Sequence, residues 1–359
     1  MIFFNKNLVI KVVDKELCVG CGLCETLFGA DKVKMSLSSK GFLAPTISSS
    51  FQDTDNKLFQ KVCAGLNVEN NKSRKIWGDL IKVRIGFSVD EHVRYTGASG
   101  GSISALACYL LGEKIVDSII HIGPADTDPL MNETKISSTP DEVIKNAGSR
   151  YSPAAPLTVL GQLEERKKYA FIGRPCDVFA LKEYIDQTNN YKDQIKYFFS
   201  FFCAGIPSLN GTLEVLRLLN VDQKEVKSIR YRGEGWPGFF KVELNDGKVL
   251  KKKYSETWGT VLNKYIAPRC HKCRLALGSE ADIVFADAWY RDSYGEPDFE
   301  ERKGLNLIIT RTEKGEKLLL ESVSKNIVGI KDEITEDQIR LFQPYQYKKA
   351  VKLNKNKIS

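Results

Sequence analysis

Three cysteines near the start of the chain have a spacing that suits an iron–sulfur cluster. Cys18, Cys21 and Cys24 form a C-x2-C-x2-C run with one glycine in each gap. A cluster needs thiolates on a tight loop whose backbone N–H groups point at the sulfides, and glycine permits that conformation. Where the bacterial ferredoxin pattern has its next cysteine, this chain has Phe28. Cys63 is the only other cysteine in this region, so we predict one 4Fe–4S cluster on these four cysteines. A zinc site or free thiols are the alternatives.

Four further cysteines are spread along the chain. Cys176 and Cys203 each follow a predicted strand, and Cys270 and Cys273 form a C-x2-C pair after a Pro-Arg turn. Four thiols are the number that one cluster requires. Their spacing alone leaves open a second cluster, half of a zinc site or packed thiols. Cys108 lies in an apolar predicted helix and is expected to pack as a small hydrophobic residue.

The rest of the sequence predicts the elements that would position these residues. A glycine-rich turn at 95–101 leads into a buried helix, and two short apolar strands are each followed by a turn and a helix. In order, the predicted elements are a helix at 102–111, a strand at 168–172, a helix at 177–185, a strand at 194–202, a helix at 211–219, a hairpin at 226–246 and 248–258, strands at 283–286 and 305–310, and a closing helix at 315–322. Repeated strand–turn–helix units favour an α/β fold around a mostly parallel sheet, whose ligands bind at the carboxyl ends of strands.

Composition narrows the class of protein. The chain has 359 residues, 42% of them hydrophobic and 27% charged, which predicts a globular protein and excludes wholesale disorder. The apolar stretches are too short for a membrane span, and the start lacks the pattern of a secretory signal, so we expect a cytoplasmic protein. The charge of +8 is spread along the chain apart from 251–253 and a lysine-rich end, which we expect to be solvated and frayed. No nucleic-acid-binding module is present, although a basic face would suit an acidic protein such as a ferredoxin. Nine cysteines in a reducing compartment favour metal or cluster ligation over disulfides.

Nine motifs occur in an order that resembles one known family. They are CVGCGLC at 18–24, TGASGG at 96–101, GSRYSP at 148–153, FIGRPCDVFAL at 171–181, FFCAGIPS at 201–208, RYRGEGWPG at 230–238, PRCHKC at 268–273, ADIVFADAW at 281–289 and GLNLIITRTEKGE at 304–316. Together they resemble the coenzyme F420 hydrogenase/dehydrogenase beta-subunit family, which includes 7-hydroxymethyl chlorophyll a reductase and bacterial members linked to polysaccharide genes.

This resemblance implies a fold, cofactors and a domain order. It implies a mixed α/β iron–sulfur flavoprotein with an N-terminal ferredoxin-like part and an FAD-binding α/β body. It also implies a second 4Fe–4S cluster on Cys176, Cys203, Cys270 and Cys273. We place the ferredoxin-like domain at 1–75, the two parts of the family region at 80–160 and 161–335, and a basic tail at 336–359. Two departures matter: Cys63 is followed by Ala-Gly where the family has Pro-Gly, and use of F420 does not carry over, since many bacterial relatives live in cells without it.

The resemblance also suggests which residues contact the flavin. It places Thr96, Ser99, Gly100 and Gly101 against the flavin, although a glycine-rich turn alone would equally suit helix packing. Arginines suit a pyrophosphate or an anionic reduced flavin, with surface salt bridges as the alternative. Arg232 and Trp236 lie in a glycine-rich segment that would form either a loop over the flavin or an exposed hairpin turn. The remaining candidates are Arg150, Arg174 and Asp287, of which Asp287 would orient a cluster ligand or the flavin.

These expectations lead to one function and two rivals. The expected function is an oxidoreductase in which a ferredoxin-like donor docks near the N-terminal cluster and electrons reach FAD through the second cluster. FAD then transfers a hydride to a small-molecule substrate. The rivals are a non-catalytic electron-transfer subunit of a larger redox complex and a zinc-stabilised binding protein.

Overall fold

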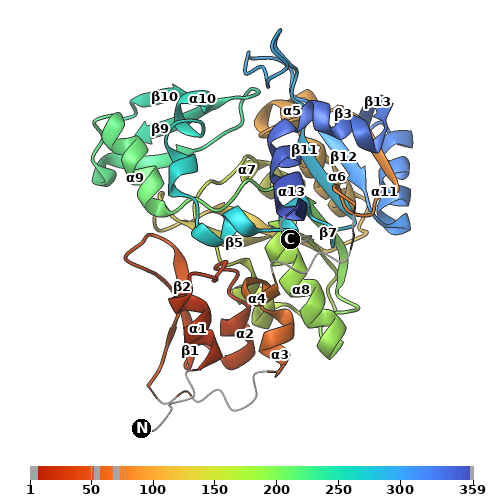
Figure 1. The fold of residues 1–359 in the computed structure, drawn as a ribbon. Coiled ribbons are helices and arrows are strands. Elements are labelled where there is room, and N and C mark those ends of the chain that lie inside the picture. The colour runs from red at the N-terminus through yellow and green to blue at the C-terminus, as the bar shows by residue number, and fades with distance from the viewer. Residues whose placement is uncertain (1–6, 50, 52–56, 68–72, 74, 356–359) are drawn as a thin grey trace.

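A computed structural model describes residues 7–49, 51, 57–67, 73 and 75–355 (Figure 1). It has an N-terminal unit, a large mixed sheet covered by helices, and a small three-stranded sheet with its own helix. Two stretches rich in Ser, Asn and Asp, at 48–56 and 67–73, lie largely outside the described residues, as do Lys357 and its neighbours at the end of the chain. Among the described residues, no helix combines the length and the apolar character that crossing a membrane requires.

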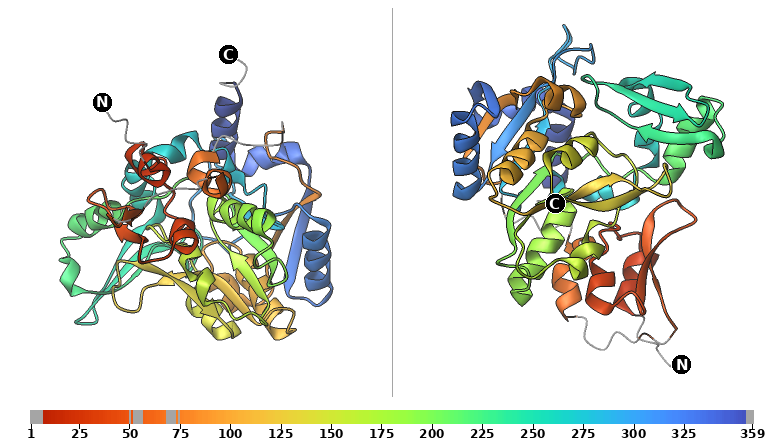
Figure 2. Two further views of the ribbon diagram at one scale, coloured as in Figure 1. Left: turned by 90° about the horizontal axis from the view of Figure 1, so that it is seen from below. Right: turned by 180° about the vertical axis from the view of Figure 1, so that it is seen from behind.

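The N-terminal unit is small and packs against the body of the protein. Its elements are α1 (Leu8–Asp14), α2 (Leu23–Phe28), the antiparallel hairpin β1 (Val33–Leu37) and β2 (Leu43–Ile47), α3 (Lys57–Val62) and α4 (Ala64–Asn67). Val9, Val12 and Phe59 form the centre of its own core. The unit rests on η1 (Pro156–Gln162) and α8 (Pro175–Thr188), and Figure 2 shows this contact from two sides. Leu157 ties the two parts together, since its N–H donates to the Cys21 carbonyl at 2.9 Å.

The body is built on an eight-stranded sheet of order β13-β3-β12-β11-β7-β6-β4-β5. The strands are β3 (Lys82–Ser88), β4 (Ser118–Pro124), β5 (Asn132–Ser137), β6 (Tyr169–Ile172), β7 (Ile195–Phe201), β11 (Ile283–Asp287), β12 (Asn306–Thr310) and β13 (Val328–Ile334). Only the central run β11-β7-β6-β4 is parallel, while the pairs on either side of it are antiparallel. The α/β class is confirmed, but the expectation of a mostly parallel sheet is wrong.

Alternating side chains of the sheet face two different cores. In β11, Ile283 and Phe285 belong to the cluster formed with α6 (Ser102–Gly112) and α11 (Glu313–Ser324). Val284 and Ala286 face the other way, into the cluster that holds the buried side of α8. This alternation is the two-residue period of a strand covered on both faces. The remaining helices of the body are α5 (Glu91–Thr96), α7 (Pro140–Lys145), α9 (Leu209–Leu218), α10 (Tyr254–Thr257), α12 (Ile339–Phe342) and α13 (Pro344–Lys355), with short 3-10 turns η2 (Gln223–Glu225), η3 (Leu262–Tyr265), η4 (Pro268–Lys272), η5 (Leu275–Leu277) and η6 (Glu336–Gln338).

Three predicted segments differ from the structure. The predicted hairpin is a three-stranded antiparallel sheet of β8 (Val226–Arg230), β9 (Phe239–Leu244) and β10 (Val249–Lys253), in which 231–238 is a loop and 254–257 is helical. The lysine-rich end is not frayed over its described part, because 344–355 forms α13, which packs beside η5. Helix α11 does not close the fold, since β13 follows it and pairs with β3.

The glycine-rich turn before α6 is closely packed, which gives a test of the fold. A Cβ atom on Gly100 would lie 2.7 Å from Oδ1 and 2.8 Å from the backbone N of Asn306, and 3.0 Å from the Gly86 carbonyl. We expect Gly100→Ala to lower the free energy of unfolding by about 1–3 kcal/mol, because backbone atoms of two strands would have to move. Gly112→Ala, at the other end of α6, meets no atom within 4 Å. This control should leave the free energy within about 1 kcal/mol of the wild type, on the stabilising side. Equal denaturation midpoints for the two variants would contradict the packing described.

Candidate functional site

The first cysteine set surrounds one small cavity in the N-terminal unit. Its members are Cys18, Cys21, Cys24 and Cys63. Cys18 and Cys21 lie on the loop between α1 and α2, Cys24 lies in the first turn of α2, and Cys63 lies between α3 and α4. Gly20 and Gly22 have φ values of +68° and +85°, as expected of a tight loop around sulfur ligands. The Gly20 N–H donates to the Cys18 Sγ at 3.3 Å. Folding therefore brings together the four cysteines that the sequence assigned to one cluster.

These four thiols are buried, and burial governs their protonation. Burial raises the pKa of each of them, to about 11 for Cys63. Neighbouring thiolates of the same set raise the pKa of Cys21 and Cys24 further. Thiolates, not thiols, ligate metals, so a bound cation must displace the protons.

The second cysteine set meets at the carboxyl ends of two parallel strands. Cys176 lies in the first turn of α8 after β6, and Cys203 follows β7. Cys270 lies in η4, and the Cys273 N–H donates to its carbonyl at 3.3 Å. Burial raises the pKa of Cys176 and Cys203, and the charge of Cys273 adds to the increase at both. These four cysteines therefore also form one group, whereas Cys108 lies on α6 and its thiol donates to the Pro140 carbonyl at 3.8 Å.

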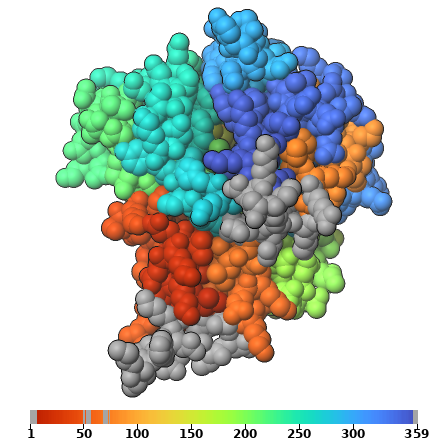
Figure 3. Space-filling view, in the orientation of Figure 1, coloured from red at the N-terminus to blue at the C-terminus, as the bar shows by residue number. Residues whose placement is uncertain are grey.

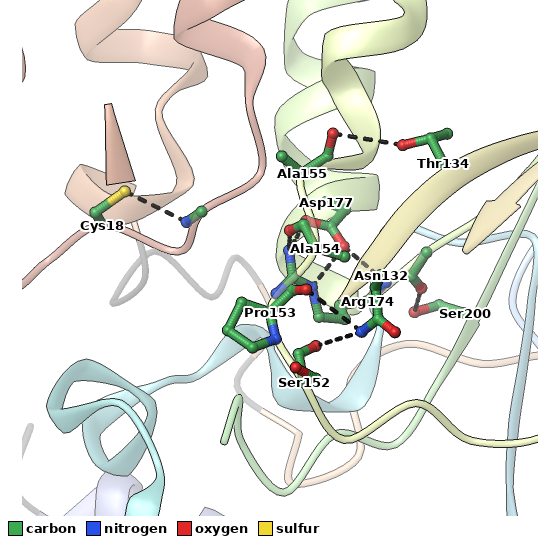
Figure 4. Close-up of polar contacts among 12 residues, drawn as sticks. Cys18, Asn132, Thr134, Ser152, Pro153, Ala154, Ala155, Arg174, Asp177 and Ser200 are labelled. Carbon is green, nitrogen blue, oxygen red and sulfur yellow. Dashed lines mark hydrogen bonds and ion pairs between the residues drawn. The ribbon is translucent and has the colours of Figure 1, made fainter. Parts of the chain in front are cut away.

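A buried ion pair separates the two cysteine sets. Arg174 Nε and Nη2 each donate to a carboxylate oxygen of Asp177 at 2.7 Å, and Nη2 also donates to the Ala154 carbonyl at 3.0 Å (Figure 4). Burial is the largest cause of the raised pKa of Cys21 and of Cys176, and the negative charge of Asp177 is the next largest cause at both. One carboxylate thus lies near a cysteine of each set, so the two sets are neighbours.

The Arg269 side chain also connects the two cysteine sets. Its surroundings indicate whether iron–sulfur clusters fit these sets. Its side chain is 4% exposed, and its Nη1 donates to the Leu17 carbonyl at 3.1 Å. Its Nε and Nη2 are buried and have no hydrogen-bond partner among the described residues. A buried cation with unused N–H groups needs negative charge nearby, and a cluster held by four thiolates supplies it. The residues therefore fit clusters. Within the described ranges, no three His, Cys, Asp or Glu side chains are close enough to share one metal ion, so the cluster assignment rests on the two four-cysteine sets and this cation.

Of the four candidate flavin residues of the glycine-rich turn, Thr96 ends α5, and Ser99, Gly100 and Gly101 lie between α5 and α6. Ser99 Oγ donates to the Leu305 carbonyl at 2.8 Å, and the Thr96 carbonyl accepts from Arg230 Nη2 at 2.5 Å. Gly100 and Gly101 pack against backbone atoms of β12 and α5. Internal packing therefore explains the glycines. Gly101, at the start of α6, has no side chain to cap the helix, and Asn306 Oδ1 accepts from the Ser102 N–H at 3.1 Å. The other N–H groups of the first turn have no partner within the helix.

Two predicted arginines are already engaged within the chain. Arg150 Nε donates to Asn132 Oδ1 at 2.7 Å and its Nη1 donates to the Ile229 carbonyl at 2.7 Å. Burial lowers the pKa of Arg150. Arg174 is held by Asp177, as described above. Neither guanidinium forms the surface salt bridge that was the alternative expectation, because both are largely buried.

Arg232, Trp236 and Asp287 form one buried cluster. The Asp287 carboxylate accepts from Arg232 Nη1 at 2.8 Å, from Arg232 Nη2 at 2.7 Å and from Trp236 Nε1 at 2.8 Å. Trp236 also stacks on Trp289 with ring centroids 4.9 Å apart. The loop 231–238 is therefore fixed to the end of β11 and is not an exposed hairpin turn.

Comparison with known proteins identifies the family. A sequence model described as the N-terminal part of the coenzyme F420 hydrogenase/dehydrogenase beta subunit matches residues 84–161, and one described as its C terminus matches residues 166–336. The two matches together span more than half of the chain. The chain belongs to the coenzyme F420 hydrogenase/dehydrogenase beta-subunit family. The resemblance seen in the motifs is confirmed.

Individual relatives in this family are distant. A coenzyme F420 hydrogenase subunit beta of Methanococcus voltae is 25% identical over 68% of this chain and 82% of its own length. An F420-dependent formate dehydrogenase subunit beta of Methanocaldococcus jannaschii is 23% identical over 73% of this chain and 67% of its own length. A chain of the F420-reducing [NiFe] hydrogenase complex of Methanosarcina barkeri superposes with a TM-score of 0.59 at 20% identity. The superposition covers 80% of this chain and 94% of that one. It shows that the two chains share a fold.

The sequence did not single out three residues that organise the site. Arg230 and Arg269 lie inside two of the nine motifs. The sequence led us to assign flavin contact to Arg232 and cluster ligation to Cys270, but no role to these two arginines. Asn306 Oδ1 accepts from the Ser102 N–H at 3.1 Å and so joins β12 to the start of α6. A basic residue directly before a C-x2-C pair was a usable signal for Arg269, whereas the role of Asn306 depends on contacts about 200 residues apart.

Proposed function

We propose that this chain is an iron–sulfur flavoprotein oxidoreductase that binds two 4Fe–4S clusters and FAD in the cytoplasm. The observation that carries the proposal is the cavity lined by Cys18, Cys21, Cys24 and Cys63. It is supported by the four cysteines of the second set, of which Cys176 and Cys203 follow β6 and β7, and by Asp177, which lies near Cys21 as well as Cys176. Membership of a family named for hydrogenase and dehydrogenase subunits supports a redox role. All nine cysteines are free thiols, which suits a reducing compartment.

Two regions of the chain would hold the groups. The first and second cysteine sets would each hold a cluster, and the turn 96–101 with Arg230 would hold the flavin. When bound, clusters carry single electrons and FAD exchanges one electron or a hydride, so together they connect one-electron carriers with a hydride donor or acceptor. Arg230 supports the flavin assignment, because its buried Nε makes no hydrogen bond among the described residues and has only an ion pair at 3.7 Å with Glu234 Oε1 there. A dinucleotide phosphate at the N-terminus of α6 would suit that cation.

The order of the strands supports a direction of electron transfer, from the first cysteine set through the second set to the flavin. The first cysteine set lies beside η1 and α8, and the second lies at the ends of β6 and β7. The turn 96–101 lies beyond β11, against β12 and β3. In this proposal a ferredoxin-like donor docks at the N-terminal unit, and the second set stands between the first set and the flavin.

Anaerobic reduction of the holoprotein tests this function. Reduced ferredoxin mixed with the full chain should bleach the cluster absorbance and then the yellow flavin absorbance. A flavin that stays oxidised while the clusters bleach would contradict the proposal.

A second candidate is an electron-transfer subunit that serves a separate catalytic partner. It is favoured because the matched relatives are named as beta subunits of hydrogenases and formate dehydrogenases. Turnover of a small hydride carrier, such as a nicotinamide or a deazaflavin of the F420 type, by the isolated chain would favour the enzyme. Activity only after addition of a partner subunit would favour the second candidate.

A further inference from the structure

Arg269 spans the space between the two cysteine sets. It precedes Cys270 of the second set in the chain, and its Nη1 donates to the carbonyl of Leu17, the residue before Cys18 of the first set. The same carbonyl packs against Gly65, two residues after Cys63, where a Cβ atom would lie 2.7 Å from it. One side chain therefore connects η4 with both cysteine-bearing segments of the N-terminal unit. Figure 3 shows that unit directly against the surface of the body.

The charge of Arg269 has no counter-ion among the described residues. Arg269 is 4% exposed, and no salt bridge to it occurs in the described part of the chain. Its Nε and Nη2 remain unpartnered there. Arg269 is the residue before Cys270 of the second set, and its hydrogen bond to the Leu17 carbonyl holds its guanidinium beside the first set. The cation therefore lies next to both sets.

Arg274 gives a matched contrast. It follows Cys273 directly, as Arg269 precedes Cys270. Its guanidinium points to the C-terminal helix α13, where Nη1 donates to Asn354 Oδ1 at 3.0 Å and Nη2 donates to the Leu353 carbonyl. A charge of the same kind beside the same cysteine pair is thus directed away from the first set.

We propose that Arg269 is a positioning residue shared by both clusters, which stabilises their negative charge and raises both reduction potentials at once. This inference rests on the proposed function. Reduction adds an electron to an anionic cluster, so a buried cation nearby favours the reduced state. Its unused N–H groups are the donors through which hydrogen bonds to sulfur tune such sites.

Redox titration of the anaerobic full chain, followed by electron paramagnetic resonance, tests the inference. Arg269→Gln should shift the midpoint potentials of both clusters to more negative values. Arg274→Gln, the control, should leave the potential of the first cluster unchanged. Unchanged potentials in Arg269→Gln, or a shift of one cluster alone, would overturn the inference.

Iron and sulfide content of the same samples separates a charge effect from misfolding. If Arg269→Gln fails to hold iron, Arg269→Lys, which keeps the charge, should retain iron in both sets. Loss of iron from Arg269→Lys as well would mean that shape rather than charge matters, and would overturn the inference. A wild-type chain without iron would instead contradict the proposed function and this inference with it.

Discussion

Replacing Cys176 with serine is expected to remove one cluster and to stop electrons from reaching the flavin. Cys176 is buried at the start of α8, and the charges of Cys203 and Cys273 act on it. With one thiolate lost, the second set can no longer close around a cluster, and iron should fall from about eight to about four atoms per chain. The donor-to-flavin rate should fall below detection, because in the proposed route electrons pass through the second set before they reach the flavin. Iron analysis and anaerobic stopped-flow absorbance measure the two effects.

Two further variants make this result specific. Cys21→Ser should remove the iron of the first set and leave that of the second. Cys108→Ser, a change of the same kind outside both sets, should retain all the iron and full transfer. A Cys176→Ser chain that still reduces its flavin at the wild-type rate would show that the second set is not on the route.

Asp287→Ala should be the most destabilising single change in the buried cluster of Arg232, Trp236 and Asp287. Asp287 accepts two hydrogen bonds from Arg232 and one from Trp236. Arg232 is 3% exposed, and its Nε is also committed to the Pro237 carbonyl at 2.9 Å. Removing the carboxylate leaves a buried cation without its partner, which costs about 3–5 kcal/mol of unfolding free energy. Urea denaturation, followed by far-UV circular dichroism, measures the loss.

An exposed pair of similar geometry provides the control. Arg217 donates to Glu214 through Nε and Nη2, both at 2.8 Å, but the Arg217 side chain is 68% exposed. Glu214→Ala should leave the denaturation midpoint almost unchanged, because solvent screens this pair. If Asp287→Ala were as mild as Glu214→Ala, the buried cluster would not be what fixes the loop 231–238.

Local sequence patterns predicted the elements that carry the site. Around Cys176 the sequence predicted a strand at 168–172 and a helix at 177–185, and the structure has β6 at Tyr169–Ile172 and α8 at Pro175–Thr188. Both elements were found because their patterns are contiguous in sequence, but α8 begins two residues earlier than predicted, at Pro175, which suits the first position of a helix. The mixed character of the sheet was not predictable in this way. Strand β3 pairs with β12 and β13, which lie more than 200 residues further along the chain, and no local pattern records the direction of such a partner.

The predicted site residues also differ in whether the local sequence was enough to assign them. The C-x2-C-x2-C spacing is local, so it identified the first set, whereas Cys63 required an argument by elimination. Arg150 and Arg174 were expected to reach toward a flavin, but the structure shows their guanidinium groups bound to Asn132 and Asp177. Sequence alone does not show whether an arginine faces a ligand or a polar group of its own chain. Arg150 lies in a loop, and its partner Asn132 lies on β5.

Analysis of iron, acid-labile sulfide and flavin in the anaerobically purified full chain is the most direct test of the central claim. We expect a brown protein with about eight irons, about eight sulfides and one FAD per chain, and with cluster and flavin bands in its absorption spectrum. A colourless chain, or one that holds zinc and no iron or flavin, would contradict the proposal that this chain binds two clusters and FAD.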